Sequence, residues 1–344
     1  MKTVKIGEKW VGDNNPCYVA AEIGGLFKTF EEAKNLIDSA KEIGFDAIKI
    51  QTFEANTITT RKNFFNLGVT GHVSQYDFFQ KMEVSKELQL EVVKYANDVG
   101  LPIYSAPSHI KDLETMKKMN PPAYKIGSDL ACHTQLLKEV AKFDKPIILS
   151  TGMCTMDEVK RSVKSILNEG NDQIIILHCV SDYPTKIEES NLNAITTMKN
   201  EFDFPVGYSD HTIGTLIPLA ASIMGANMLE KHFRHPDNSK HADDLHALTP
   251  AEFQNLIKSI RDVESAKGSG IKSPSKSEKE NLVTNRVSIV SMTEIPKGTL
   301  ITQDMLDIRR PGFGIEPYYF YDVIGKKARK NISREEPIMW DTIE

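Results

Sequence analysis

The chain has 344 residues, of which 40% are hydrophobic and 26% are charged, and this ordinary globular composition excludes a largely disordered protein. Its formal net charge of -5 excludes a broad attraction to nucleic acid or to an anionic membrane, so a positive charge that binds an anion has to be local. No apolar segment typical of a signal peptide follows residues 1–10, and no apolar run reaches the roughly 18 residues of a membrane-spanning helix, so we expect a soluble, cytoplasmic protein.

Short β-rich runs alternate with amphipathic helical stretches along the chain, which is the pattern of βα units around a parallel sheet. In the first unit, apolar residues recur at helical spacing from Phe30 to Ile43, and Gly44 follows as a helix stop. Eight such units favour a closed (β/α)8 TIM barrel over an open doubly wound sheet. The predicted strands are 18–22, 47–51, 102–106, 123–126, 146–150, 174–179, 206–209 and 228–232.

Two stretches interrupt this pattern. Residues 52–85 form a long polar and aromatic insertion after the second strand, typical of a lid or binding loop and equally of a surface loop or subunit contact. Residues 268–277 are small and polar, as in a linker. We therefore predict a barrel domain over residues 1–280 and a small β-rich domain over residues 281–344, which packs onto a barrel because it buries little core alone.

Polar residues end most of the apolar runs, and in parallel barrels the active site lies at the C-terminal ends of the strands. We expect these side chains to meet at one mouth. The candidates are Glu22, Lys49, Gln51, Lys125, Ser128, Ser150, Tyr183, Ser209, His211, Glu230 and His232.

Lys49 and Lys125 each lie inside an apolar run, where an unmatched ammonium is costly. One interpretation is a pair of internal salt bridges with Glu22 or Glu230. The other is an anion site, in which the serine hydroxyls of the mouth complete the contacts to phosphate or carboxylate oxygens.

His211 and His232 end two adjacent predicted strands. A single strand-end histidine is usually a satisfied core residue, but two at neighbouring strand ends favour a divalent metal site, for manganese with zinc as an alternative. The other histidines lack this frame, and we assign them to the surface or the periphery of the site. A group in the last βα loop either reaches the metal or a sugar hydroxyl or is solvated. It comprises His241, Asp243, Asp244 and His246.

Taken in order, these stretches resemble the sialic acid synthase family, which condenses phosphoenolpyruvate with an N-acetylated amino sugar to give a nine-carbon 2-keto-3-deoxy acid. The resemblance covers nearly the whole chain. Each motif is weak alone and the ordered set is specific. The motifs are Ala21-Glu22-Ile23-Gly24, Lys49-Ile50-Gln51, Tyr124-Lys125-Ile126-Gly127-Ser128, Leu149-Ser150-Thr151-Gly152-Met153, Leu177-His178-Cys179 with Tyr183-Pro184, residues 205–214, Glu230-Lys231-His232-Phe233 and Arg310-Pro311-Gly312.

The resemblance implies a TIM barrel followed by an antifreeze-like (SAF) domain, in a domain-swapped homodimer where an arginine matching Arg310 reaches a partner's site. It implies a divalent ion on His211 and His232, with manganese expected and magnesium or cobalt as alternatives. The implied catalytic residues are Glu22, Lys49 and Lys125, and we add Asp129 as the replacement for a family carboxylate that is missing at the next position. The implied substrate contacts are Ser128, Ser150, Tyr183 and Ser209 for phosphoenolpyruvate, and Gln51, Asp243 and Arg310 for the sugar.

The chain departs from the family at two places. The family's Asn-His-x-Gly is replaced by Gly25-Leu26-Phe27-Lys28, and its second catalytic carboxylate falls on Leu130, beside Asp129. Two other functions therefore stay open. One is a Schiff-base aldolase that uses a barrel lysine as nucleophile. The other is a catalytically lapsed protein that binds sugar or assembles through its tail domain.

Overall fold

A computed structural model describes residues 2–67, 71–234 and 245–344 of the chain. The chain divides into two compact units, Met1–Gly268 and Ser269–Glu344, and each is described by itself. The linker-like stretch of the sequence thus begins where the first unit ends. The boundary that we predicted after residue 280 falls within a short helix of the second unit, α11 (Lys279–Thr284).

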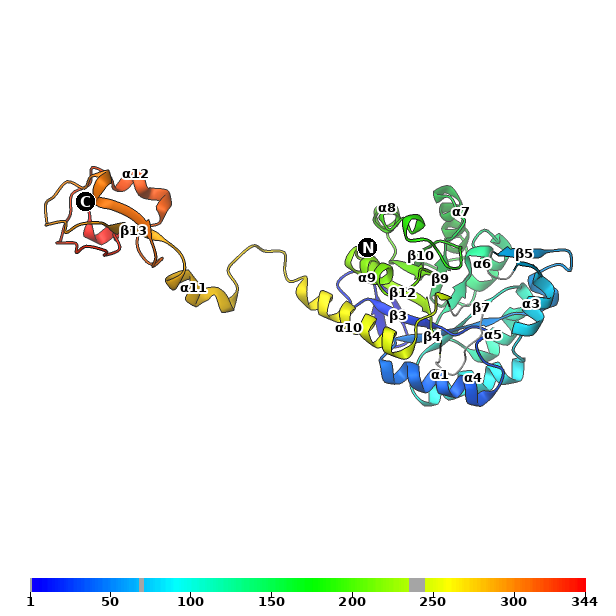
Figure 1. The fold of residues 1–344 in the computed structure, drawn as a ribbon. Helices are drawn as coiled ribbons and strands as arrows, with labels where there is room; N and C mark the ends of the chain where they lie inside the picture. Colours follow the sequence, from blue (N-terminus) through cyan, green and yellow to red (C-terminus); the bar gives the residue numbers. More distant parts are fainter. Residues whose placement is uncertain (1, 68–70, 235–244) are drawn as a thin grey trace. The chain divides into compact units, whose positions relative to one another are not determined.

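The first unit is a closed barrel of parallel strands in the order β10-β11-β12-β3-β4-β7-β8-β9, with helices around it (Figure 1). The predicted TIM barrel is confirmed, and each strand lies within one residue of its predicted bounds. The strands are β3 (Tyr18–Glu22), β4 (Ala47–Thr52), β7 (Ile103–Pro107), β8 (Tyr124–Ile126), β9 (Ile147–Ser150), β10 (Ile174–Cys179), β11 (Val206–Asp210) and β12 (Met228–His232).

Helix α1 shows how the sequence sets the bounds of a barrel helix. Thr29 caps its N-terminus in a capping box with Glu32, and Gly44 ends it with φ 92°, a conformation that glycine adopts without strain. Its buried face consists of apolar residues at helical spacing. The barrel helices are α1 (Phe30–Ile43), α4 (Lys86–Asp98), α5 (Leu113–Met119), α6 (Thr134–Ala141), α7 (Met156–Leu167), α8 (Asn193–Glu201), α9 (Leu216–Ile223) and α10 (Pro250–Ala266).

Two apolar clusters hold the barrel together. The larger one lies between the strands and the helices. The smaller one fills the barrel interior around Tyr18 and Tyr104, and it includes Val4, Ile6 and Val11 of the N-terminal hairpin β1 (Val4–Ile6) and β2 (Lys9–Val11). This hairpin therefore closes the N-terminal end of the barrel, opposite the mouth.

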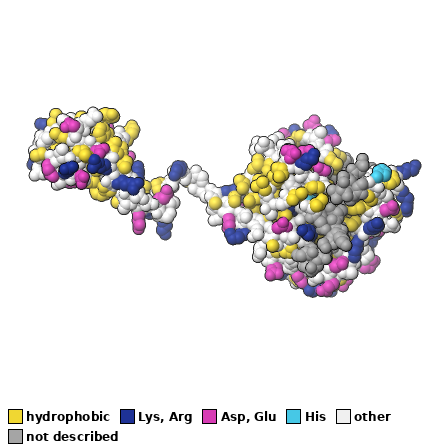
Figure 2. Space-filling view, viewed as in Figure 1, with side chains coloured by type: hydrophobic (Ala, Val, Ile, Leu, Met, Phe, Trp, Pro, Cys, Tyr) yellow, Lys and Arg dark blue, Asp and Glu magenta, His cyan; other side chains and the backbone are white. Residues whose placement is uncertain are grey.

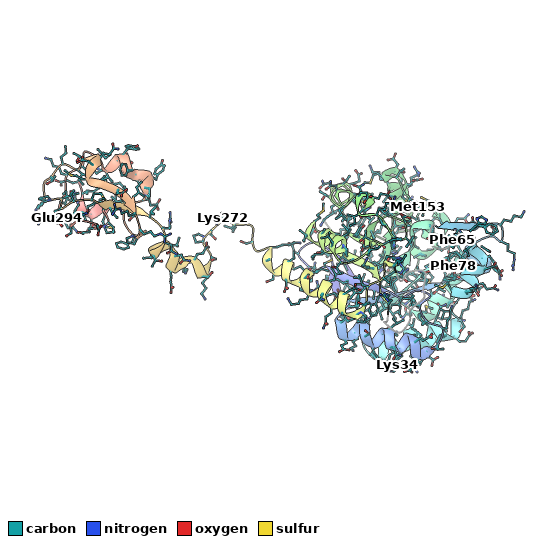
Figure 3. All side chains as sticks on the ribbon, in the orientation of Figure 1. Lys34, Phe65, Phe78, Met153, Lys272 and Glu294 are labelled. Atoms are coloured by element: carbon teal, nitrogen blue, oxygen red, sulfur yellow. The ribbon has the colours of Figure 1, made fainter. Side chains whose placement is uncertain are left out.

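The insertion after β4 folds into a small layer of its own. It contains α2 (Ala55–Ile58), the antiparallel hairpin β5 (Phe64–Leu67) and β6 (Gly71–Ser74), and α3 (Gln75–Met82). The rings of Phe65 on β5 and Phe78 on α3 meet edge to face with centroids 5.3 Å apart (Figure 3). Aromatic contacts therefore join the hairpin to the helix.

The second unit has its own core. It contains α11, α12 (Phe320–Val323) and the antiparallel pair β13 (Ser288–Ser291) and β14 (Leu306–Arg309). Its core is aliphatic, formed by Ile289, Ile295, Ile301, Leu306, Ile315, Val323, Ala328, Ile332, Ile338 and Ile343.

Charged side chains of both signs are interspersed over the visible faces of both units (Figure 2). An anion must therefore be bound by a local group of cations. Among the described residues, none of the helices combines the length and the apolar character that crossing a membrane requires.

Candidate active site

The C-terminal mouth of the barrel gathers most of the predicted site residues. Neighbouring strands place them in register, with Glu22 opposite Lys49 and His232 opposite Glu22. Because side chains alternate along a strand, residues two apart face the same side. The predicted residues buried at this mouth are Glu22, Lys49, Lys125, Ser150, Ser209, His211 and His232.

Both buried lysines are paired with carboxylates. Lys49 forms an ion pair with Glu22 on the neighbouring strand. Lys125 Nζ lies 2.9 Å from Glu230 Oε1, and these two side chains come from strands on different sides of the barrel. The internal salt bridges that the sequence allowed are thus present. All four side chains are less than 10% exposed, so their charges act on one another through little solvent.

The two pairs form one electrostatic network. Burial on its own raises the pKa of the Glu230 carboxyl, but Lys125 and Lys49 outweigh it and lower that pKa to about 2. Burial on its own lowers the pKa of Lys49, but Glu22, Glu230 and Asp129 together raise it. Lys49 therefore stays an ammonium at neutral pH.

Hydroxyl groups from neighbouring loops surround Gly152, just after β9. Ser128 Oγ accepts a hydrogen bond from Gly152 N at 3.0 Å, and a Cβ at Gly152 would collide with the hydroxyls of Ser128 and Ser181. Among the described residues, the buried hydroxyls of Ser150 and Ser181 have no hydrogen-bond partner. Such groups are costly unless a ligand satisfies them, so we call these hydroxyls the cradle, whose donors fit an oxyanion in their chemistry.

His211 and His232 approach each other as the sequence predicts, with ring centroids 5.6 Å apart. His211 Nδ1 lies 2.9 Å from the backbone carbonyl of Val180, so Nδ1 carries the proton and Nε2 holds the lone pair. Tyr183 packs on His211 with centroids 4.1 Å apart. His246 lies 4.7 Å from His232 by the same measure.

The imidazoles of His211 and His232 are suitable ligands for a divalent ion. Burial lowers the pKa of His211, which keeps its imidazole neutral, and a neutral imidazole oriented by a backbone carbonyl is the form that binds metals. Within residues 2–67, 71–234 and 245–344, no group of three or more His, Cys, Asp or Glu side chains could hold an ion. The two histidines would therefore be the protein ligands that this part of the chain supplies.

Asp129 and Leu130 lie in the 3-10 turn Ser128–Leu130 that follows β8. The Asp129 carboxylate is near enough to raise the pKa of Lys49, whereas Leu130 packs against the hydrophobic core. Of these two neighbours, Asp129 is the one that acts electrostatically on a lysine of the mouth.

Comparison with known proteins gives the family. Residues 36–272 match the NeuB family, and residues 286–344 match the SAF domain. The chain belongs to the NeuB family. A protein of Methanocaldococcus jannaschii without an assigned function is 38% identical over 100% of this chain and 99% of its own length. The N,N'-diacetyllegionaminic acid synthase of Legionella pneumophila is 33% identical over 98% of both chains.

Solved structures of NeuB-like enzymes share this architecture. The crystal structure of an N-acetylneuraminic acid (sialic acid) synthetase from Leptospira borgpetersenii superposes with a TM-score of 0.73 at 27% identity, covering 82% of this chain and 95% of that one. The sequence-based recognition of the family and of its C-terminal SAF domain is thus confirmed.

The remaining predicted site residues of this NeuB-family chain differ in where the structure places them. Gln51 does lie there, half-buried at the end of β4 against Gly24. Arg310 is exposed on the SAF unit, which is described separately. Asp243, like His241 and Asp244, falls outside the described residues. At the first departure from the family motif, Leu26 and Phe27 are buried in the core.

Sequence reasoning left His246 open and missed Ser181. His246, for which the sequence allowed either a place near the metal or a solvated one, is buried beside His232. Ser181 lies in the loop that carries Tyr183, two residues after β10, and its hydroxyl borders Gly152. The signal for Ser181 was its position just after an apolar run, which the other candidates share.

Proposed function

We propose that this NeuB-family protein condenses phosphoenolpyruvate with an N-acetylated amino sugar aldehyde to give a nonulosonic acid and phosphate. The observation that carries the proposal is the mouth itself, where two buried ammonium groups, an oxyanion cradle and two imidazoles lie together. The names of the relatives from Legionella and Leptospira, both nonulosonic acid synthases, support this reaction class.

Phosphoenolpyruvate binds across the two lysines and the cradle. Lys49 and Lys125 donate to the phosphate and carboxylate oxygens, and the buried hydroxyls of Ser150 and Ser181 supply donors that have no described protein acceptor. Ser209, whose Oγ lies 3.2 Å from Glu230 Oε1, and Ser128 provide further hydroxyls. Tyr183 covers this ligand from the solvent side of the mouth.

His211 and His232 hold a divalent ion in this proposal, manganese with magnesium or cobalt as alternatives. Such an ion, when bound, polarises the carbonyl of an open-chain aldehyde as a Lewis acid. The chain's own part is to keep the His211 imidazole neutral and oriented through the Val180 carbonyl.

The condensation forms one carbon–carbon bond and breaks one carbon–oxygen bond. Carbon 3 of phosphoenolpyruvate attacks the aldehyde carbon, water adds at carbon 2, and phosphate leaves from the tetrahedral intermediate. Glu22 and Asp129 move the proton from the attacking water and the proton of the new hydroxyl. Lys49, paired with Glu22 and within electrostatic reach of Asp129, stabilises the charge that develops on the departing phosphate.

The acceptor sugar lies above phosphoenolpyruvate, toward solvent. Gln51 contacts it from β4, and we assign Asp243 and the partner subunit's copy of Arg310 to the same sugar in a domain-swapped homodimer. N-acetylmannosamine and a diacetylated sugar are both candidates, since the names of the two relatives correspond to one product of each kind.

Phosphate release from phosphoenolpyruvate tests the proposal. Purified protein is assayed over a panel of aldoses, with manganese and with a chelator, and the His211→Ala variant serves as the control. We expect release that needs both an amino-sugar aldehyde and the ion, and that the variant loses. No release with any acceptor in the presence of manganese would contradict the reaction.

The same preparation decides between the two other functions. A Schiff-base aldolase needs a neutral lysine, and the raised pKa of Lys49 disfavours it there. Borohydride trapping that yields no covalent adduct, together with chelator inhibition, would exclude that mechanism. Glycan binding without turnover, unchanged by His211→Ala, would instead identify a lapsed enzyme.

A further inference from the structure

A buried ion pair lies on the outer face of the barrel, directly behind the two histidines. Asp210 and Lys231 are opposite each other in the register of β11 and β12, one residue beyond Ser209 and Glu230. Because Ser209 and Glu230 face the lumen, Asp210 and Lys231 point outward into the layer that α9 covers. Their side chains are 0% and 1% exposed.

This pair is joined to the chain on both sides of His211. Lys231 Nζ donates to Asp210 Oδ2 at 2.5 Å and to the backbone carbonyl of Thr212 at 2.6 Å. Asp210 Oδ1 accepts from the backbone N–H of Thr212 at 3.2 Å and from its hydroxyl at 2.9 Å. We call Asp210, Thr212 and Lys231 the clamp.

The clamp connects the two strands that carry the histidines. Asp210 precedes His211, Thr212 follows it, and Lys231 precedes His232. The backbone N–H of Thr185 also donates to the carbonyl of His211 at 3.0 Å, which ties the loop of Tyr183 to the same peptide. The position of His211 relative to His232 therefore depends on side chains that do not themselves enter the mouth.

Stability alone does not explain charges at this position. A buried ion pair is worth little compared with well-packed apolar residues, because desolvation offsets the attraction, and apolar residues fill most of the layer between strands and helices. Each of the three side chains of the clamp has a defined hydrogen-bond partner within it, so the network favours one backbone arrangement around His211.

We propose that Lys231 is a positioning residue, which through Asp210 and Thr212 sets the placement of His211 relative to His232. The inference rests on the proposed function where it concerns the ion, and it deepens that function by naming what holds the two imidazoles in place. Groups that orient metal-binding side chains typically change metal affinity about 10- to 100-fold when they are removed.

The test compares three variants of the full-length chain with the unaltered protein. Lys231→Met removes the ammonium and keeps the length of the side chain. Lys231→Met with Asp210→Asn also removes the unpaired carboxylate, and asparagine can still accept from Thr212. Lys9→Met is the matched control, because it removes an ammonium from a buried carboxylate, Asp46, at 2.5 Å near the opposite end of the barrel.

Two readouts are measured, the manganese dissociation constant by electron paramagnetic resonance and the His211 imidazole nitrogen signals by NMR of the metal-free protein. We expect both clamp variants to bind manganese at least 10-fold more weakly and to lose the single Nδ1–H tautomer, while Lys9→Met changes neither. If Lys231→Met does not fold, the double variant decides.

Different results would contradict the positioning role of Lys231 and the presence of an ion in the proposed function. Manganese binding within twofold of the unaltered protein, with an unchanged His211 spectrum in a folded clamp variant, would overturn the positioning role. Failure of the unaltered protein to bind manganese would instead remove the ion from the proposed function, and the His211 spectrum would still decide whether the clamp positions the imidazole.

Discussion

Asp129 and Leu130 are adjacent in the turn after β8 but face different surroundings, since Asp129 acts on Lys49 and Leu130 packs into the core. The carboxylate missing at position 130 therefore has a charged neighbour that acts on a lysine of the mouth. Substitutions at these two positions can therefore distinguish a role in the reaction from a role in packing.

Asp129→Asn should lower the rate of phosphate release about 10²- to 10⁴-fold, the usual contribution of a general acid or base, with little change in stability. Leu130→Ala is the matched control, and it should cost about 1–2 kcal/mol of unfolding free energy because the side chain is only partly buried. Steady-state kinetics and urea unfolding of both variants distinguish the roles. Full activity of Asp129→Asn would remove Asp129 from the mechanism.

Glu230→Gln should destabilise the fold by about 3–5 kcal/mol, because it leaves the buried ammonium of Lys125 without its anion. Lys34→Met breaks the Lys34–Asp38 pair, which is 2.8 Å long but partly exposed, and should change the unfolding free energy far less because solvent screens the pair. Equal effects in denaturant titrations would show that burial does not set the strength of the Glu230 pair.

The stability of the barrel should fall in acid through Glu230. Its pKa is lowered to about 2 in the folded chain, below the roughly 4.3 of an unfolded glutamate, so the folded state binds fewer protons. The contribution is complete above about pH 5 and is lost as pH falls from about 4.3 toward 2. The difference in unfolding free energy between the unaltered protein and Glu230→Gln should shrink over this window. A constant difference from pH 6 to pH 3 would be the opposite result.

Gly152→Ala should weaken phosphoenolpyruvate binding at least 10-fold while the fold survives, because the added methyl group occupies the cradle bordered by Ser128 and Ser181. Isothermal titration calorimetry measures the affinity and circular dichroism the fold. Ser181→Ala in the same background removes the hydroxyl nearest to the added methyl group and should restore part of the affinity if the collision, and not a backbone change, is responsible.

Manganese and phosphoenolpyruvate should strengthen each other's binding. The mouth holds the ammonium groups of Lys49 and Lys125 against the carboxylates of Glu22, Glu230 and Asp129, so without an ion its formal charge does not favour a polyanion. We expect chelation to weaken phosphoenolpyruvate binding at least 10-fold, and by reciprocity phosphoenolpyruvate to tighten manganese binding equally. If manganese no longer changes the affinity of His211→Ala for phosphoenolpyruvate, the coupling between the two ligands lies at this site.

The barrel was predictable because its strands are short apolar runs bounded by turns. The strand 174–179 reads Ile-Ile-Ile-Leu-His-Cys, is buried along most of its length and keeps its predicted bounds. The insertion after β4 was not predictable in the same way, since its hairpin and helix depend on contacts between rings such as Phe65 and Phe78 that are distant in sequence.

For the candidate site, the sequence indicates which residues lie at the strand ends but not how they pair. Strand-end positions identify Lys125 and Glu230, but their pairing crosses the barrel from β8 to β12 and appears only when the sheet closes. His246 follows no strand, so no periodicity marks it, and its place beside His232 appears only in the structure, where Leu248 N–H donates to the His232 carbonyl. The roles of all the predicted site residues, Asp243 and Arg310 included, stay predictions.

The N-terminal hairpin has a consequence for the order of events in catalysis. Val4, Ile6 and Val11 close one end of the barrel. In the described part of the chain, substrates and products therefore enter and leave through the mouth. Glu230, with its partner Lys125, lies two residues deeper along β12 than His232, about 6–7 Å. A ligand bound at that depth must arrive before one that sits above it. We therefore expect phosphoenolpyruvate to bind first. A sugar that binds before phosphoenolpyruvate should act as a dead-end inhibitor.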